Sequence, residues 1–524
     1  MSVSAGTTLP LTAAQREIWI AEQRLGKGNC VFRVGEYLEI HGGVDPELFA
    51  RALRLVVAEA EALHVRFVEE PGEVRQALRE PVGWPFAVTD LSAEPDPERA
   101  AHAWMDTAVT RPMNLTEDPL FEYALLKLGS DRFWWYQGYH HAVMDAFGSL
   151  LITRRVADVY TALAGGGTAG ESPFGTLSDL VAAEQAYRTS GQFAHDGAYW
   201  TECFTDRPQP TGIVGTPSTT PERYLRHTSA LESAEHTALR DAAHRARVPW
   251  SHLVIAAAAL HVHRTTGTAT VVLGLPVAAR LTLVERRTPG TAANVLPLRL
   301  TLRPEATLGG LLAQIGERVR ELGGHQRYRA EDIQRDLALP GRPGTWYAPV
   351  VNVMSFDYAI TFDGLPTTAH NLSSGLVGDL TFAVWDRRDG AAPAVDVNAH
   401  PELCTPDELA VHHRRLRAAL RAVTETDCSR PIGRIDLLSA EERAVVLAVP
   451  SVGVPSRVTL PELFEARVVA APGAAAVVWE GSTLSYGELN VRGDRLAHGL
   501  LGRGGGPGGV VGPALPRGGG LGVG

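Results

Sequence analysis

Lysine is nearly absent from this chain of 524 residues, since only Lys27 and Lys127 occur among its 49 basic residues. The arginines that make up the rest form no basic cluster, and 59 acidic residues give a formal net charge of −10 at pH 7. Proteins that bind nucleic acids usually carry a basic patch along one face. The charge pattern therefore argues against a nucleic-acid partner, and the net negative charge favours solubility.

Cysteine and long apolar runs are also scarce. The four cysteines lie far apart and form no CxxC pair, so neither a zinc site nor a disulfide framework is predicted: Cys30, Cys203, Cys404 and Cys428. The N-terminal stretch MSVSAGTTLPLTAAQREIW lacks a basic segment followed by an apolar one, so no signal peptide is predicted. No uncharged apolar run reaches the roughly 18 residues that a membrane span needs. We expect a cytoplasmic protein that does not enter the membrane.

The first third of the chain has the pattern of an α/β lobe. Asp45-Pro46 is a suitable N-cap and first turn for a helix whose apolar residues recur at helical spacing. The segments 121–128 and 132–139 are predicted strands with a turn between them. A helix is predicted over 149–163, and the run Gly165-Gly166-Gly167 ends it at a plausible lobe border.

The pattern then restarts in the second part of the chain. Ser251 is placed to cap the helix SHLVIAAAALHVHR (251–264), which is apolar on all sides and is therefore expected to be buried. Strands are predicted at 270–277, 348–358 and 379–386. This alternation of helices and strands places the fold in the α/β or α+β class, with two lobes.

The segment YHHAVMDAFG (139–148) stands at the end of the second predicted strand. Successive side chains of a strand point to opposite faces, so His140 and His141 are poorly placed to bind one metal ion together. One histidine is expected to face a cavity and the other the protein interior. A neutral imidazole near pH 7 can take a proton from an amine or an alcohol. Asp145 follows a turn, where it is placed to cap the next helix or to bind an arginine.

A purely structural interpretation of these residues is equally open. Two histidines can simply mark a polar strand end, and Asp145 can be an N-cap and nothing more. No serine or cysteine stands in a nucleophile-elbow setting that would complete a catalytic triad. The bare residues therefore support the catalytic and the structural interpretations to the same degree.

Similarity to a known family separates the two interpretations. HHAVMDA resembles the HHxxxDG motif of condensation domains from nonribosomal peptide synthetases, which share the chloramphenicol acetyltransferase fold. Other stretches resemble further motifs of that family in the right order: LTAAQREIW (11–19), EALHVRF (61–67), GLPVAAR (274–280), AANVLPLR (292–299) and HQRYRAEDI (325–333). The resemblance covers about residues 10–440. It implies an α/β (α+β) fold in which two acetyltransferase-like lobes form a V around a central tunnel.

The resemblance also implies a division into domains. It places the N-terminal lobe at 1–170, the C-terminal lobe at 171–440 and a linker at 441–458. In the remainder, LSYGEL (484–489) resembles the opening motif of an adenylation domain, so 459–524 is expected to be a truncated, inactive N-terminal fragment of one. The last 24 residues contain twelve glycines but no Gly-Lys-Ser/Thr, so no phosphate loop is predicted there.

The same resemblance implies roles for the residues of the histidine segment. His141 matches the second histidine of the motif, which is expected to face the tunnel and to act as general base or orient the nucleophile. His140 matches the structural histidine. Asp145 is expected to pair with Arg280 across the lobe interface, and a bidentate pair would fix the turn that carries His141. The role of Asp145 is then geometric and not proton transfer.

Two further positions bear on the site. Asn294 matches a position near the lobe crossover, where a structural role is expected. Ala146 stands where the family has a glycine. Two effects are open. The methyl group of Ala146 could narrow the tunnel, or the backbone at this position could need a conformation that only glycine adopts easily. Because alanine is the mildest replacement for glycine, we expect activity to be kept; the alternatives are a reshaped substrate preference or a silent site.

The reaction implied by the resemblance is attack of an amine on a thioester, which forms an amide. An acyl, aryl or aminoacyl donor and an aminoacyl acceptor would both arrive on phosphopantetheine arms of carrier proteins, and the chain itself would bind no cofactor and no metal. Carrier proteins in trans are the expected partners, because no carrier precedes the domain, together with other synthetase modules. The stretches PVVNVMSFDY, HNLSSG and DLTFAVWD resemble siderophore-type condensation domains, which take an aryl acid.

The alternative from another functional class is a catalytically silent condensation-like module that recruits carrier or tailoring proteins, with Ala146 as the sign of lost chemistry. The intact His141 favours the enzyme, since a recruiting platform does not need it. A free-standing acyltransferase that uses a soluble amine is a third option, which the adenylation-like segment disfavours.

Overall fold

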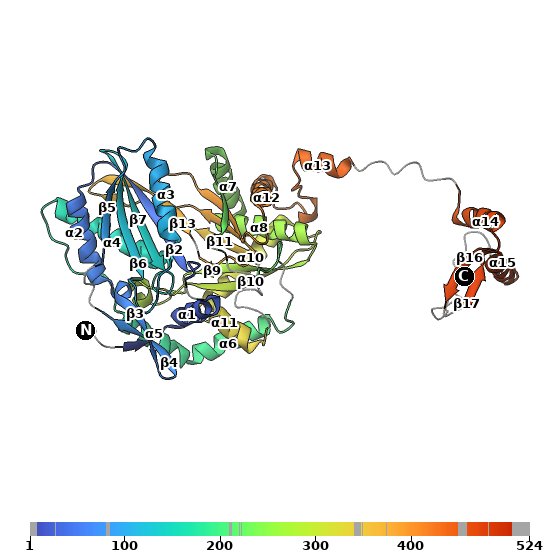
Figure 1. Cartoon of the computed structure of the whole chain (residues 1–524), viewed down its shortest axis with the longest axis horizontal. Coiled ribbons are helices and arrows are strands. Elements are labelled where there is room, and N and C mark those ends of the chain that lie inside the picture. Colours follow the sequence, from blue (N-terminus) through green and yellow to red (C-terminus); the bar gives the residue numbers. More distant parts are fainter. Residues whose placement is uncertain are drawn as a thin grey trace. The chain divides into compact units, whose positions relative to one another are not determined.

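The structure is a computed structural model that describes residues 8–26, 28–79, 84–208, 212–218, 221, 223–339, 347, 349–373, 375–448, 458–479 and 482–505. It divides into two compact units, Met1–Ser439 and Ala440–Gly524. The first unit contains two six-stranded sheets with helices packed on them (Figure 1).

The first sheet has the strand order β12-β13-β2-β7-β6-β5. Only β5 and β6 run parallel, and the other neighbours are antiparallel. The two strands and the helix predicted between residues 121 and 163 correspond to β6, β7 and α4. The elements of this lobe are β2 (Arg33–His41), α2 (Pro46–Glu59), β5 (Phe86–Asp90), α3 (Pro97–Val109), β6 (Phe121–Lys127), β7 (Arg132–His140), α4 (Ala146–Ala164), β12 (Thr361–Phe362) and β13 (Leu365–Ser373).

The two faces of the first sheet follow the alternation of side chains along β7. Trp135 packs with Phe49 of α2 on one face, at a ring distance of 5.2 Å. Tyr136 packs with Trp104 of α3 on the other face, at 5.4 Å. Each large side chain buried in this way contributes about 1.5–3 kcal/mol. The odd-numbered positions of β7 therefore point towards α2 and α4, and His141 continues that series.

Helix α2 begins where the sequence predicts it. The carboxylate of Asp45 accepts hydrogen bonds from the backbone amides of Glu47 and Leu48, at 2.9 and 3.1 Å, and Pro46 is the first helical residue. Its apolar stripe is buried against the sheet. A capped helix of this kind is held in position by its apolar face rather than by intrinsic propensity alone.

The second sheet has the order β10-β9-β11-β14-β15-β8, in which β11 runs parallel to both β9 and β14. Strands at 270–277, 348–358 and 379–386 were predicted, and β9, β11 and β14 lie there. The elements are β8 (Leu225–Ala230), α7 (Ser233–Ala246), α8 (Trp250–Thr266), β9 (Thr270–Val277), α9 (Leu283–Arg287), β10 (Asn294–Thr301), α10 (Leu308–Gly324), α11 (Ala330–Asp336), β11 (Val350–Met354), β14 (Leu380–Trp385), β15 (Ala394–Ala399), α12 (Pro406–Glu425) and the 3₁₀ turn η2 (Ile432–Arg434).

Helix α8 is the buried helix that the sequence predicts. All residues from His252 to Val262 are buried, which explains why no polar face interrupts this part of the sequence. The predicted cap is wrong, however. The helix begins at Trp250 with Pro249 as its N-cap residue, and no side chain caps it. Proline fixes a backbone conformation that suits a helix start, so Ser251 is already inside the first turn.

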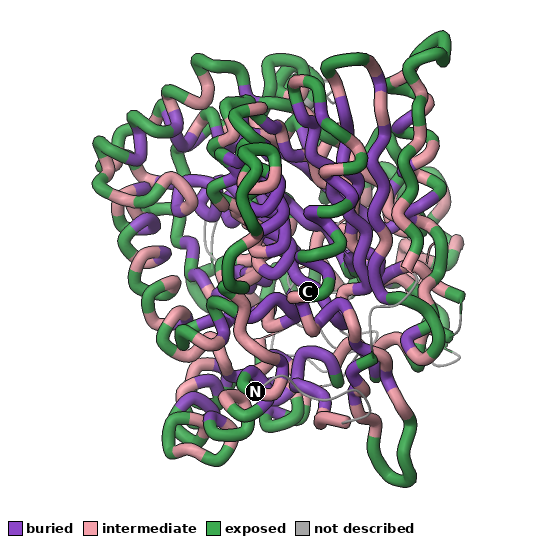
Figure 2. Tube along the Cα trace, turned by 90° about the vertical axis from the view of Figure 1, so that its left-hand side faces the viewer, coloured by how far each residue is buried: buried purple, intermediate pink, exposed green. Residues whose placement is uncertain are grey.

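Smaller elements complete the first unit. Three strands form a sheet of order β1-β4-β3, and the indole of Trp19 stacks on Phe67 of β3 at 5.7 Å. Buried residues run through the interior of the molecule, while the outer turns are exposed (Figure 2). These elements are β1 (Thr8–Pro10), α1 (Ala13–Leu25), η1 (Glu61–His64), β3 (Val65–Glu70), β4 (Glu73–Leu78), α5 (Leu177–Arg188) and α6 (Gly191–Cys203).

One crossover corrects the predicted division into lobes. β12 and β13 come from the range assigned to the C-terminal lobe, yet β13 pairs with β2 from Thr367–Ile40 to Ser373–Gly35 and completes the first sheet. A single boundary at residue 170 therefore does not separate the two sheets. The chain returns to the first lobe because an edge strand is stabilised by a hydrogen-bonded neighbour.

The second unit contains α13 (Ala440–Leu447), α14 (Leu460–Ala470), β16 (Ala475–Trp479), β17 (Ser482–Ser485) and α15 (Tyr486–Leu501). The predicted linker at 441–458 thus starts as a helix, and its residues 449–457 lie outside the described residues. No residue of α14 is buried, and Leu460 and Val469 are more than four-fifths exposed. Most of the predicted glycine-rich tail, 506–524, also lies outside the described residues.

Candidate active site

The end of β7 and the start of α4 form the turn that carries the predicted site. The amide of His140 donates to the carbonyl of Leu120 at 2.9 Å, and the amide of His141 donates to the carbonyl of Phe32 at 2.7 Å. Thr291 lies in the second lobe, between α9 and β10. Its hydroxyl donates a hydrogen bond to the carbonyl of His141. The backbone on both sides of the His141 side chain is therefore fixed.

The His141 side chain lines a cavity of about 390 Å³. Strands β2 and β7 and helix α4 of the first lobe contribute to its wall, as do β9, β10, β11, β14 and β15 of the second. Atom Nδ1 of the ring is fully buried and makes no hydrogen bond within the described residues, and the backbone carbonyls of His141 and Met144 lie near the ring. A proton on Nδ1 leaves Nε2 as the basic nitrogen.

Burial lowers the pKa of His141 below its ordinary value, and the nearby charge of Asp145 offsets only part of that effect. The desolvated ring therefore resists protonation and is neutral near pH 7. Gly375, at φ +86°, passes so close that a Cβ atom there would lie 3.4 Å from Cδ2 of His141. A glycine at this position leaves room beside the ring.

His140 has the opposite orientation and is buried. Its Nδ1 accepts a hydrogen bond from the amide of Ala142 at 3.1 Å, which closes the turn. Its Nε2 lies 3.8 Å from the carboxylate of Glu22 in α1. His141 thus faces the cavity and His140 faces the interior, as strand alternation predicts. The hydrogen bond of His140 supports the turn.

Asp145 is the N-cap residue of α4 and is 3% exposed. Its Oδ1 accepts from the amide of Gly148 at 2.8 Å. Its Oδ2 accepts from the amides of Ala292 and Ala293 at 2.9 and 3.0 Å. Arg280 Nη2 lies 3.1 Å from Oδ1 and 3.2 Å from Oδ2. The predicted alternatives for Asp145, a helix cap or an arginine partner, are therefore both realised.

The pair differs from the predicted bidentate geometry. A single guanidinium nitrogen, Nη2, contacts both carboxylate oxygens, whereas a fork-to-fork pair uses two nitrogens. Nη1 of Arg280 instead donates to the carbonyls of Glu285 and Thr288, and Nη2 also donates to the carbonyl of Gly290 at 2.8 Å. Arg280, 4% exposed, thereby fixes the end of α9 and the segment that follows it, up to Gly290, against the end of β7.

Burial alone would raise the pKa of the Asp145 carboxyl, but the charge of Arg280 and the three backbone amides lower it to below its ordinary value. The group therefore stays ionised at neutral pH and does not serve as a proton donor. All of the hydrogen bonds that the Asp145 carboxylate accepts come from Arg280 and from backbone amides, and these bonds hold the donor groups in position. A positioning role for Asp145 agrees with this geometry.

A second ion pair supports the same segment from the other side. Arg329 pairs with Glu17 of α1, and its Nη1 donates to the carbonyls of Ala292 and Ala293 at 3.1 and 2.9 Å. These are the two residues whose backbone amides donate to Asp145. Sequence reasoning missed both residues, because nothing in their local pattern points to a segment so far away in the chain.

Ala146 opens α4 with helical backbone and does not belong to the residues with positive φ. No backbone strain therefore follows from the missing glycine, and the alanine lines the cavity as an exposed methyl group. The glycine that the turn does require is Gly148. A Cβ atom there would lie 2.6 Å from Sδ of Met144 and 2.8 Å from the carbonyl oxygen of Gly290.

Asn294 is buried at the start of β10 and points away from the reacting residues. Its Nδ2 donates to the carbonyls of Gln326 and Tyr328 at 3.1 and 2.8 Å, and its Oδ1 accepts from the amide of Ala330 at 3.3 Å. All of its side-chain bonds join β10 to the segment before α11. The structural role of Asn294 stays a prediction, which these bonds support.

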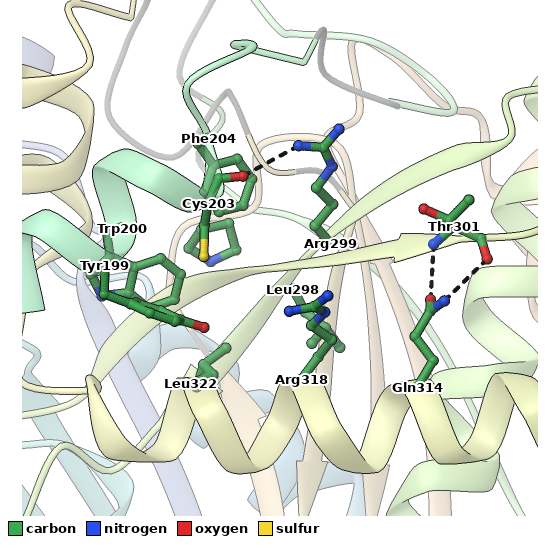
Figure 3. A pocket seen from close by; sticks show the side chains of 11 residues that line it. Tyr199, Trp200, Cys203, Phe204, Leu298, Arg299, Thr301, Gln314, Arg318 and Leu322 are labelled. Carbon is green, nitrogen blue, oxygen red and sulfur yellow. Dashed lines mark hydrogen bonds between the residues drawn. The ribbon is translucent and has the colours of Figure 1, made fainter.

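Another cavity, of about 320 Å³, lies between α6, β10 and α10 (Figure 3). None of the predicted site residues lines it. Arg299 is paired with Asp206 and also donates to the carbonyl of Cys203, and Arg318 is paired with Glu321. Because its charged groups are already matched within the protein, we assign it no part in the reaction.

Within the described ranges, no three histidine, cysteine or acidic side chains gather as a metal-binding group, and none of the four cysteines forms a disulfide bond. The same ranges contain no helix with the length and apolar character that crossing a membrane demands.

Comparison with known proteins decides the family. A profile of the condensation domain matches residues 5–447. The chain belongs to the condensation-domain family. The dimodular nonribosomal peptide synthase of Bacillus subtilis (strain 168) is 38% identical over 509 residues, which cover 97% of this chain and 21% of that protein. Enterobactin synthase component F of Escherichia coli (strain K12) is 30% identical over 97% of this chain and 39% of its own length.

A solved structure is similar over the same region. The starter condensation domain of rhizomide synthetase, in complex with C8-CoA and Leu-SNAC, gives a TM-score of 0.76 at 38% identity and covers 83% of this chain and 98% of its own. The predicted fold, with two lobes of the chloramphenicol acetyltransferase type, is confirmed, and so is the predicted class, a condensation domain of nonribosomal peptide synthetases.

Proposed function

We propose that this condensation domain joins a carrier-bound acyl thioester to the amino group of a carrier-bound aminoacyl thioester. The observation that carries the proposal is the His141 ring on the wall of a cavity that both lobes enclose. The backbone on each side of this residue is hydrogen-bonded, and burial keeps the ring neutral. A neutral, fixed imidazole open to a cavity is suited to general-base catalysis.

The reaction needs one bond to form and one to break. The amine nitrogen attacks the thioester carbon, and the C–S bond breaks when the tetrahedral intermediate collapses to the amide. Nε2 of His141 takes the proton that the amine loses and passes it to the departing sulfur, which leaves as a thiol. Such proton transfer contributes typically about 10²- to 10⁴-fold. Asp145 and Arg280 position the turn and do not exchange protons.

The partners belong to the same proposal. Both substrates would arrive on phosphopantetheine arms of carrier proteins, with the donor carrier in trans, and the chain would bind no cofactor of its own. An aryl acyl group is one candidate donor, since the second lobe resembles siderophore-type domains and enterobactin synthase component F is a relative. Residues 459–524 would be the start of an adenylation domain within a longer synthetase.

The test is mass spectrometry of the acceptor carrier after reaction with two loaded carriers. Wild type, His141→Ala and Ala146→Gly are run in parallel. An amide product from wild type that His141→Ala loses supports the proposal. Wild-type turnover in His141→Ala refutes the role of that histidine. Product from Ala146→Gly alone, or carrier binding without product from either protein, would favour the silent recruiting module.

A further inference from the structure

Glu36 of β2 places a carboxylate inside the cavity that holds His141. In the antiparallel register Glu36 lies opposite Gln137, and the odd positions of β7 lead on through Tyr139 to His141. Glu36 therefore shares a sheet face with the His141 side chain. It is 8% exposed and lines the cavity. Gln137, the residue opposite Glu36, precedes His141 by four positions, which corresponds to about 13 Å along the strand direction.

Two hydroxyl groups hold this carboxylate in place. Ser149 of α4 donates to Oε1 at 2.6 Å, and Tyr358 donates to Oε2 at 3.0 Å. Burial raises the pKa of Tyr358 well above its ordinary value, and the charge of Glu36 adds to that effect, so the phenol remains a donor. A carboxylate offers about four lone-pair positions, of which these hydroxyls occupy two.

No ion pair with Glu36 occurs in the part of the chain that the structure describes. The arginine of the cavity wall, Arg387, lies over the rings of Tyr358 and Trp385, at 5.4 and 4.9 Å from their centroids. Nearby polar groups have partners of their own, since the hydroxyl of Tyr139 donates to Gln137 at 2.8 Å. A buried carboxylate with spare acceptor capacity is costly unless something in the cavity donates to it.

The surrounding wall has an extended apolar part, although Asn352, Asn371 and Asn398 also line the cavity. The apolar lining includes Val34, Val277, Val295, Val353, Met354 and Phe356. The apolar part of this wall accepts a hydrocarbon portion of a substrate, and the Glu36 carboxylate offers an acceptor to a hydrogen-bond donor on that substrate. The strand distance from His141 exceeds the reach of an amino acid side chain whose amino group lies at that histidine. An acyl chain has no such limit.

We propose that Glu36 selects the donor: the acyl group carries an O–H or N–H group remote from its thioester, and this group donates to the Glu36 carboxylate while the thioester lies at His141. The inference rests on the proposed function and names the substrate class of the same cavity. Both a hydroxyl and an ammonium group can donate a hydrogen bond to this carboxylate, and the experiment below distinguishes between them.

The test uses three thioesters of matched length on one carrier: nonanoyl, 8-hydroxyoctanoyl and 8-aminooctanoyl. They compete in one reaction for the same aminoacyl acceptor, and the products are read by mass spectrometry. Wild type should prefer the hydroxy or the amino donor over nonanoyl by about 10- to 100-fold, the range expected for a hydrogen bond to a charged group. A larger preference for the amino donor would identify the group as an ammonium.

Variants separate the carboxylate from general effects on folding. Glu36→Gln should lose the preference for the amino donor and keep part of that for the hydroxy donor, because the amide oxygen still accepts. Glu36→Leu should favour nonanoyl. Glu39→Gln is the matched control on the same strand, since Glu39 faces the other side of the sheet and pairs with Arg132. It should leave the ranking of donors unchanged.

Equal use of the three donors by wild type would overturn the assignment, and so would an unchanged ranking in Glu36→Leu. Calorimetry of the three S-acyl pantetheines with His141→Ala measures the same ranking without turnover. Loss of turnover with every donor would refute the proposed function, whereas the affinity ranking still decides the role of Glu36.

Discussion

Replacement of Asp145 by asparagine tests whether the histidine turn depends on the contact between the lobes. The carboxylate accepts hydrogen bonds from the amides of Gly148, Ala292 and Ala293 and from the guanidinium of Arg280. The last three partners come from the second lobe. Asparagine has nearly the same shape, so the change removes the charge and one acceptor without opening a cavity.

The magnitude follows from the burial of the pair, with both side chains at most 2% exposed. Removing one partner of a buried ion pair costs about 3–5 kcal/mol. The asparagine NH₂ group would also face the amides of Ala292 and Ala293, and a buried donor without an acceptor costs about 1–3 kcal/mol. Because these effects overlap, we expect a loss of about 4 kcal/mol, which for a domain of this size lowers Tm by on the order of 5 °C.

The assay is thermal unfolding of the full chain, followed by tryptophan fluorescence, together with the condensation assay. Asp90→Asn is the matched control: Asp90 forms an ion pair of 2.8 Å with Lys127, but the side chains are 54% and 35% exposed. Exposed pairs contribute little, so this control should keep its Tm. An Asp145→Asn protein with the Tm of wild type would refute the reasoning, because a buried pair would then behave like an exposed one.

The pH dependence provides a second check on the same residue. The pKa of Asp145 is lower in the folded chain than the ordinary value of about 3.9. Its stabilising contribution is therefore fully present above that value and is lost as the pH falls through the folded-state pKa. The difference in Tm between wild type and Asp145→Asn should be constant from pH 8 to pH 5 and should shrink only in stronger acid.

Three other predictions follow from the site. Since burial lowers the pKa of His141, the acid limb of kcat/KM should have its midpoint below about 6.5, and a midpoint above that value would contradict a desolvated base. Gly148→Ala should lower the free energy of unfolding by about 1–3 kcal/mol, because the added methyl group overpacks the turn. Gly323→Ala is the control and should not destabilise the protein, since the space around its Cβ position is open. Equal Tm values for the two variants would contradict the close approach at Gly148. Burial and the neighbouring Glu17 raise the pKa of the Glu331 carboxyl to about 9. Because the unfolded chain releases this proton near about pH 4.3, the folded state becomes less stable as the pH rises above that value. Glu331→Gln should therefore raise Tm at pH 8 and not at pH 4.5.

Much of the fold could be predicted from local pattern. β7 carries a continuous run of large side chains on both faces because α2 and α4 cover one face and α3 the other, so the sequence shows a strand of unusual aromatic content. Asp45 capped its helix as predicted, because this signal lies within three residues of the backbone groups that it satisfies. The cap of α8 was wrong, because Pro249 starts that helix through its backbone conformation and leaves no side-chain signal.

The parts that could not be predicted depend on contacts between distant segments. The return of β13 to the first sheet follows from pairing with β2, which lies more than 300 residues earlier. The partners of Asp145 at 292 and 293 are backbone amides, for which any residue type suffices, so no sequence signal marks them. Glu36 and Glu39 lie in the same strand, and nothing in the local sequence separates their roles. In the structure Glu36 lines the cavity, whereas Glu39 pairs with Arg132.

The segment 291–294 explains why the two lobes determine the position of one histidine. From the first lobe, Asp145 binds the amides of Ala292 and Ala293; from the second, Arg329 binds their carbonyls. Thr291, one residue before them, donates to the carbonyl of His141. Any rotation between the lobes must therefore either break these bonds or move His141 with the segment. Because the amides and the carbonyls of the same two residues are held by two different side chains, the arrangement resists small shifts, and the basic nitrogen keeps its place in the cavity whichever substrate enters first.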